Sequence, residues 1–106
     1  MLIAPRSVDG DTVWLGGEKI RIADIDTPEI SEPRSQSEYD RGIQARDRLA
    51  ALLSEREFEV HPNETQDEDR YGRKLQVLTR DGRSLGNMMV SEGHARTWTG
   101  RREPWC

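Results

Sequence analysis

The stretch "TVWLGGEKIRI", residues 12–22, is typical of a β-hairpin and decides the fold. Two runs of mostly apolar and β-branched residues, 12–15 and 20–22, lie on either side of Gly16-Gly17. A pair of glycines supplies the positive φ angles that a tight hairpin turn requires. The stretch therefore predicts two antiparallel strands, the second of which runs to about Ile25.

Shorter apolar patterns predict the elements that follow. The polar residues 30–41 are typical of a surface loop, and apolar residues at helical spacing predict a helix over 43–54. Alternation predicts strands near residues 58–60 and 75–79, and Ser84 is a candidate cap of a short helix that ends before Gly93. This order indicates a mainly β, α+β fold in which helices flank a small β-barrel.

The length of 106 residues predicts one domain, residues 1–106, which we expect to be a monomer. No run approaches the ~18 apolar residues of a membrane span, so we expect a soluble chain without a membrane partner. It would be cytoplasmic, or secreted or periplasmic if an export signal had been removed. The net charge of −4 argues against long-range attraction to nucleic acid, and Cys106, the one cysteine, excludes an intrachain disulfide.

Carboxylates gather at one end of the predicted hairpin. Asp9 and Asp11 precede its first strand, and Asp26 and Glu29 lie at the end of its second. Because antiparallel strands place the start of one beside the end of the other, Asp11 and Asp26 can meet. Two close carboxylates repel unless a hard cation such as Ca²⁺ or Mg²⁺ lies between them. The alternative is that Asp-Gly-Asp only forms a turn.

A second charged motif, "DRYGR", spans residues 69–73. Arginine can hold two phosphate oxygens at once, and tyrosine can stack on a base or donate a hydrogen bond. The alternative is a solvated turn whose arginines pair with neighbouring acids. A cation, carboxylates and two arginines together would suit phosphoryl transfer.

Three motifs taken in order resemble the staphylococcal nuclease-like family over roughly residues 7–98. They are "VDGDT" at 8–12, "RIADIDTPE" at 21–29 and "DRYGR" at 69–73. The resemblance implies a five-stranded OB-fold Greek-key β-barrel with two to three flanking helices. It also implies a Ca²⁺-dependent phosphodiesterase that hydrolyses DNA or RNA and leaves a 3′-phosphate.

The resemblance also implies a role for each matching residue. Asp11, Asp26 and the Thr27 carbonyl would hold the metal, and Glu29 would position or deprotonate the attacking water. Arg21 and Arg73 would clamp the scissile phosphate. Substrate contacts would come from the adjacent Arg70 and Tyr71.

The chain departs from the family pattern after the second predicted helix, where the family has tyrosines and this chain has Trp98. Core packing is the favoured interpretation of Trp98, and a base-stacking face is the other. A positive path for the substrate would have to come from six arginines: Arg34, Arg41, Arg46, Arg48, Arg101 and Arg102.

Two other functions stay open. The first is a non-catalytic OB-fold module that binds nucleic acid or protein, and the second is a Ca²⁺-binding structural domain. Metal-dependent cleavage distinguishes the enzyme from both.

Overall fold

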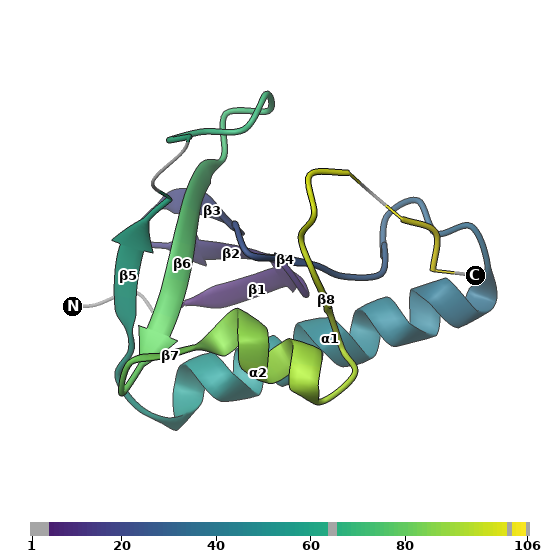
Figure 1. Ribbon diagram of the computed structural model, residues 1–106. Coiled ribbons are helices and arrows are strands. Elements are labelled where there is room, and N and C mark those ends of the chain that lie inside the picture. Colours follow the sequence, from purple (N-terminus) through teal and green to yellow (C-terminus); the bar gives the residue numbers. More distant parts are fainter. Residues whose placement is uncertain (1–4, 64–65, 102, 106) are drawn as a thin grey trace.

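The predicted hairpin lies within a mixed β-sheet that packs against two helices (Figure 1). The structure is a computed structural model, and it describes residues 5–63, 66–101 and 103–105. Strands β2 (Thr12–Leu15) and β3 (Glu18–Ile22) pair antiparallel, as predicted. Gly16 and Gly17 between them have φ angles of 56° and 83°, which confirms the glycine turn.

A strand that the sequence analysis did not predict precedes the hairpin. Strand β1 (Arg6–Asp9) pairs antiparallel with β2, and its register shifts between Ser7 and Asp9. The motif "VDGD" is therefore a tight turn between two strands rather than the start of the first strand. The exposed, mixed residues of β1 lack the apolar alternation that marks a strand.

The sheet has the strand order β1-β2-β3-β6-β5, and β7 (Arg83–Ser84) pairs with β6. Strands β5 (Glu59–Pro62) and β6 (Lys74–Arg80) form an antiparallel pair, whereas β3 and β6 run parallel. The chain thus leaves β3, passes through a helix and β5, and returns beside β3. This order confirms the predicted α+β class with an OB-like arrangement of strands.

Helix α1 (Gln36–Glu55) begins seven residues earlier than predicted, so the prediction of a loop over 30–41 is wrong in its second half. Ser35 caps the helix by accepting a hydrogen bond from the Glu38 backbone N–H. The pattern Ser-x-x-Glu is a helix-start signal that outweighs the lack of an apolar stripe in the first turns. At the other end, the buried Arg80 guanidinium donates to the carbonyls of Leu52, Arg56 and Glu57.

Helix α2 (Leu85–Ser91) confirms the predicted cap, since Ser84 accepts from the Asn87 N–H. Gly93 follows with a φ of 82°, as expected just past a helix end. The chain then forms the two-residue strand β8 (Arg96–Thr97), which pairs with β4 (Ile25–Asp26). This small sheet was not predicted, and it joins the last part of the chain to the end of the hairpin.

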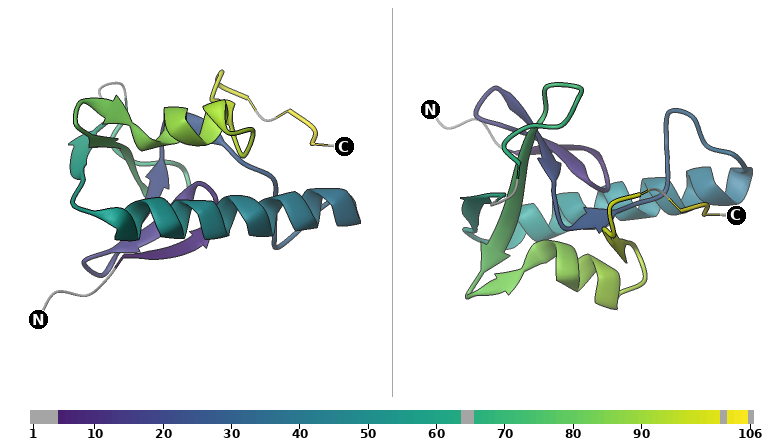
Figure 2. Two further views of the ribbon diagram at one scale, coloured as in Figure 1. Left: turned by 90° about the horizontal axis from the view of Figure 1, so that it is seen from below. Right: turned by 45° about the horizontal axis from the view of Figure 1, so that its top comes forward.

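The core lies between the sheet and both helices. Viewed from below, α1 passes across β1 and β2 while α2 lies beside it (Figure 2). Most of the core consists of aliphatic side chains, namely Val13, Ile20, Ile22, Ile25, Ala45, Leu49, Leu52, Leu53, Leu78, Leu85, Met89 and Ala95. Among the described residues, neither helix has the length and apolar character to cross a bilayer.

Candidate active site

The turn between β1 and β2 fixes the position of Asp11. The Asp9 carboxylate accepts a hydrogen bond from the Asp11 backbone N–H at 3.1 Å, which closes the turn. Gly10 is required here, because a Cβ would lie 2.7 Å from the Ala45 side chain on α1 and 2.8 Å from Thr27. The turn therefore packs directly against α1 and against the residue that follows Asp26.

A break between β3 and β4 turns Asp26 toward Arg21. On a regular strand these residues, five apart, would face opposite sides. Here β3 ends at Ile22 and β4 starts at Ile25, with a turn between the two strands. The Arg21 guanidinium spans this turn and donates to the carbonyls of Ile22 and Ile25, the latter at 2.7 Å.

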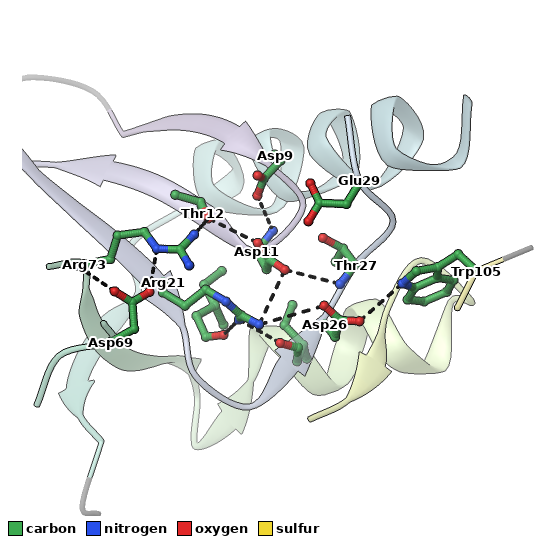
Figure 3. A network of polar contacts seen from close by, with 12 residues as sticks. Asp9, Asp11, Thr12, Arg21, Asp26, Thr27, Glu29, Asp69, Arg73 and Trp105 are labelled. Atoms are coloured by element: carbon green, nitrogen blue, oxygen red, sulfur yellow. Dashed lines mark hydrogen bonds and ion pairs between the residues drawn. The ribbon is translucent and has the colours of Figure 1, made fainter. Parts of the chain in front are cut away.

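Arg21 lies between the two aspartates that were predicted to meet. Its Nη2 is 3.6 Å from Asp11 Oδ2 and 4.0 Å from Asp26 Oδ1 (Figure 3). The Thr27 N–H donates to the same Asp11 oxygen at 3.3 Å. All four residues are nearly buried, so the guanidinium charge offsets the repulsion between two carboxylates in a poorly solvated place.

Asp9 adds a third carboxylate beside this group. Burial, followed by repulsion from the Asp11 carboxylate, raises the pKa of Asp9 to about 7. A bound cation would reverse this effect, because its charge favours ionised carboxylates. Asp9 and Asp11 therefore have different roles: Asp9 stabilises the turn between β1 and β2, and Asp11 faces Arg21.

Arg73, the second predicted phosphate ligand, is held on the other side of Asp11. Its Nε donates to Asp69 Oδ2 at 2.6 Å, and its Nη1 donates to the Thr12 hydroxyl at 3.2 Å. The Thr12 hydroxyl in turn donates to Asp11 Oδ1 at 3.1 Å. Thr12 therefore links Arg73 to the carboxylates around Arg21 (Figure 3).

Asp69 is ionised in this arrangement. Burial alone would raise its pKa, but hydrogen bonds from the Arg73 N–H, the Arg73 side chain and the Tyr71 N–H lower the pKa below its usual range. An ionised Asp69 fixes the direction in which the Arg73 guanidinium points. The sequence analysis placed Asp69 in the motif at 69–73 but gave it no role of its own, although pairing of an arginine of this motif with a neighbouring acid was the alternative it left open.

One pocket of about 1080 Å³ brings most of the predicted site together. Six of the eight predicted residues line it: Asp11, Arg21, Glu29, Arg70, Tyr71 and Arg73. Asp26 and Thr27 are not in its lining, but they contact Arg21 and Asp11 as described above. The Glu29 carboxylate points toward the side of the pocket on which Asp11 lies (Figure 3).

Tyr71 and Arg70 occupy the rim of this pocket. The Tyr71 ring is 69% exposed, and the guanidiniums of Arg70 and Arg73 lie 5.0 and 5.5 Å from its centre. An aromatic face and two positive charges therefore lie at the entrance of the pocket, where a ligand would contact them first.

Trp98 also lines the pocket. It is 38% exposed, and the Arg21 guanidinium lies 5.5 Å from its ring centre. The prediction that Trp98 packs in the core is therefore wrong.

The last described residues close the site from the Asp26 side. Trp105 is buried, and its indole Nε1–H donates to Asp26 Oδ2 at 3.3 Å. Arg96 and Arg41 lie over the Trp105 ring, at 3.8 and 5.1 Å from its centre. Asp26 therefore receives a hydrogen bond from a residue 79 positions away in the chain.

The oxygens present here are of the kind that hard cations bind. Two carboxylates, Asp11 and Asp26, and the adjacent Thr27 carbonyl are the candidate ligands. Within the described ranges, no group of three or more histidine, cysteine or acidic side chains is arranged to hold a metal alone. A cation bound here would thus complete its coordination with water or with oxygens of a ligand.

A family model described as "Staphylococcal nuclease homologue" matches residues 19–104. The chain belongs to this family. The match covers Arg21, Asp26, Glu29 and the motif at 69–73, whereas Asp11 precedes it. The assignment of Asp11 to the site of this nuclease homologue therefore depends on its contacts with Arg21 and Thr27.

Two relatives from Bacillus subtilis (strain 168) are similar to the chain. They are Endonuclease YncB and SPbeta prophage-derived endonuclease YokF, each 32% identical over 96 residues. The aligned region covers 86% of this chain but only 44% and 32% of those two proteins. The chain thus spans less than half the length of these relatives.

Glu38 is another buried residue of the site that the sequence analysis missed. Its carboxylate accepts hydrogen bonds from the backbone N–H groups of Glu29 and Arg34, at 3.1 and 2.7 Å. Glu38 thereby fixes the segment that carries Glu29. The Ser-x-x-Glu pattern at 35–38 was the signal that could have identified it.

The arginines proposed as a positive path mostly pair with other groups. Arg46 contacts Asp47, Arg48 contacts Glu92 and Arg101 contacts Glu103. Arg41 donates to the Trp105 carbonyl, and Arg102 lies outside the described residues. The acidic partners offset the charges of Arg46, Arg48 and Arg101, whereas the carbonyl that Arg41 contacts is neutral and leaves its charge in place.

Proposed function

We propose that this pocket hydrolyses phosphodiester bonds of DNA or RNA in a Ca²⁺-dependent reaction. The observation that carries the proposal is the convergence of Arg21 and Arg73 with Asp11 and Glu29 in one pocket. The family supports it, as do the two relatives from Bacillus subtilis, both of which are named endonucleases.

The two arginines suit the charge of the reacting group. A phosphodiester is an anion, and charge accumulates on its outer oxygens as water adds to phosphorus. Arg21 and Arg73 are both fixed by hydrogen bonds before any substrate enters, so they need little reorganisation to receive that charge. Removing one such contact typically lowers the rate about 10²–10³-fold.

The residues around Arg21 fit a hard divalent cation. Asp11 and Asp26 are nearly buried and repel one another, and the Arg21 guanidinium offers only one positive charge to both. Asp11, Asp26 and the Thr27 carbonyl would hold Ca²⁺, which requires six to eight oxygen ligands and so leaves room for others. When bound, the ion would neutralise phosphate charge and favour ionisation of a nearby water.

Glu29 is the candidate base. Glu38 holds its backbone N–H, and its side chain lines the pocket. A carboxylate within about 3 Å of a water can orient it or take its proton. In the resulting in-line reaction, the water oxygen bonds to phosphorus and the bond to the 5′-oxygen breaks, which leaves a 3′-phosphate as the family resemblance implies.

Cleavage of a fluorescent single-stranded DNA in Ca²⁺ tests the proposal. We expect cleavage to stop with a chelator and to fall about 10²–10³-fold in Glu29→Gln and Arg73→Ala. Glu59→Gln and Arg83→Gln change the same charges at exposed positions on β5 and β7, and we expect them to retain activity.

Two outcomes would contradict the proposal. A folded wild-type protein that binds DNA and Ca²⁺ without cleaving would be a non-catalytic module. Cleavage that survives both Glu29→Gln and Arg73→Ala would come from another site or from a contaminant.

A further inference from the structure

We propose that the outer face of β1, β2 and β3 beside the pocket binds a further stretch of single-stranded nucleic acid. A base would stack on Trp14, and Arg6 and Lys19 would contact the flanking phosphates. This inference rests on the proposed function, because it extends the path of the same substrate beyond the scissile phosphate.

The strand register places these three side chains in one row. Arg6 on β1 is the partner of Trp14 on β2, and Trp14 is the partner of Lys19 on β3. Residues directly opposite each other in antiparallel strands project from the same face. The row therefore has a cation at each end and an aromatic ring between them, over about 10 Å of sheet.

Alternation along the strands shows which face this is. Val13 and Ile20, which are partners of one another, are buried in the core. Their neighbours Trp14 and Lys19 must then project from the opposite face. Neither is a member of the core cluster.

The row is continuous with the active site. Thr12 and Arg21 are partners two residues further along the same strands and belong to the site. Two residues of a strand correspond to about 7 Å. Lys19 itself lines the pocket together with Arg21 and Arg73. A nucleic-acid strand that leaves the pocket past Lys19 would therefore contact Trp14 next.

The charges and the ring of this row are available to a ligand. Arg6 and Lys19 are exposed, and Trp14 between them is half-buried, so part of its ring is accessible. Within the described part of the chain, neither Arg6 nor Lys19 forms an ion pair. Trp98 and Trp105 each have an arginine over the ring, whereas no cation lies over Trp14 among the described residues. In a chain of net charge −4, this row is a local site of positive charge beside the pocket.

These properties favour a single strand over a duplex. Every unpaired base has a face that can stack on an aromatic side chain, and each stacked base is typically worth a several-fold to hundredfold gain in affinity. In a duplex that face is already covered by the neighbouring base pairs. Two cations about 10 Å apart can follow a single backbone across the sheet.

Binding is measured first, in EDTA to prevent cleavage, by anisotropy of a labelled oligothymidylate of about twelve nucleotides. We expect Trp14→Leu to weaken binding roughly tenfold and Trp14→Phe, which keeps a ring, to weaken it much less. Lys19→Gln should lower the slope of log affinity against log salt by about 0.7. Arg83→Gln, an exposed arginine on β7, is the charge-matched control and should change neither quantity.

Cleavage in Ca²⁺ then separates this proposal from the proposed function. We expect Trp14→Leu to lower kcat/KM for the long oligonucleotide and to leave cleavage of a dinucleotide, which is too short to reach the row, unchanged. If the wild type cleaves neither substrate, the proposed function fails while the anisotropy series still tests the row. If the row variants bind the oligothymidylate and cleave the long substrate as Arg83→Gln does, the row is not a single-strand site.

Discussion

The indole N–H of Trp105 donates a hydrogen bond to Oδ2 of Asp26 over 3.3 Å. The other Asp26 oxygen faces Arg21 at 4.0 Å, so the carboxylate is oriented from both sides. Two arginines hold Trp105 in place, because Arg96 and Arg41 both lie over its ring. Arg96 also donates to the Pro104 carbonyl, and Arg41 donates to the Trp105 carbonyl. A residue near the end of the chain thus positions a candidate metal ligand.

Trp105→Phe should lower the apparent Ca²⁺ affinity for cleavage roughly tenfold, because partners that orient a metal ligand typically contribute 10- to 100-fold. Phenylalanine keeps a ring between the arginines but has no N–H to donate. Trp105→Leu loses both features, so its melting temperature should fall further than that of Trp105→Phe. An unchanged Ca²⁺ dependence in Trp105→Phe would show that the hydrogen bond does not position Asp26.

Asp69→Asn should slow cleavage about tenfold, less than the loss expected for Arg73→Ala. The amide can still accept hydrogen bonds from the Tyr71 and Arg73 N–H groups but no longer forms the 2.6 Å ion pair with Arg73 Nε. The measurement is a double-mutant cycle of kcat with Arg73→Lys. If Asp69 acts by positioning Arg73, Asp69→Asn should have little further effect in the Arg73→Lys background, and additive losses would contradict this role.

The features that could be predicted from sequence are those that a short stretch specifies. The glycine turn of the hairpin and the Ser84 cap of α2 depend on residues a few positions apart. The start of α1 was missed although Ser35 and Glu38 encode it locally, because the first turns of the helix have no apolar stripe. Strand β1 was missed because it is a short, exposed strand that is defined by its pairing.

The candidate site likewise contains contacts that a short stretch of sequence specifies and contacts that depend on distant parts of the chain. The proximity of Asp11 to the end of β3 was predictable, because the hairpin register brings residues 11 and 22 together, with the Ile22 N–H donating to the Asp11 carbonyl at 2.8 Å. The position of the Arg21 guanidinium between Asp11 and Asp26 was not predicted, because it depends on the break between β3 and β4. The approach of Trp105 to Asp26 depends instead on the path of the chain after α2 and on its pairing as β8. No local pattern specifies that path.

The ion pair between Arg48 on α1 and Glu92 after α2 gives a pH-dependent contribution to stability. The hydrogen bond from Arg48 is the main cause that lowers the pKa of Glu92 below its usual 4.5. The contribution is therefore present above pH 4.5 and is lost as the pH falls through the lower folded-state value. At neutral pH it should be at most about 1 kcal/mol, because both side chains are about one third exposed.

Glu92→Gln should accordingly lower the melting temperature by a few degrees at neutral pH and make no difference at low pH. Thermal unfolding followed from about pH 7 to about pH 3 measures this. Glu57→Gln, which changes an exposed glutamate without an ion pair among the described residues, is the control and should show no such convergence. A difference between Glu92→Gln and wild type that stays constant with pH would mean that the ionised pair is not its cause.

Gly86→Ala should destabilise the protein even though alanine is the better helix former by about 1 kcal/mol. A Cβ at this position of α2 would lie 2.5 Å from Asp24 Oδ1 and 2.8 Å from the Ile25 side chain. Asp24 cannot move away freely, since its other oxygen accepts a hydrogen bond from the Ser84 hydroxyl at 2.5 Å. Overpacking of this kind typically costs about 1–3 kcal/mol, so we expect a net decrease in the free energy of unfolding measured by chemical denaturation.

An Asp24→Ala background provides the control. There the free energy lost on Gly86→Ala should be smaller by more than about 0.5 kcal/mol, because the nearest contact of the new Cβ has been removed. An equal loss in both backgrounds would identify Ile25, rather than Asp24, as the residue that requires a glycine here.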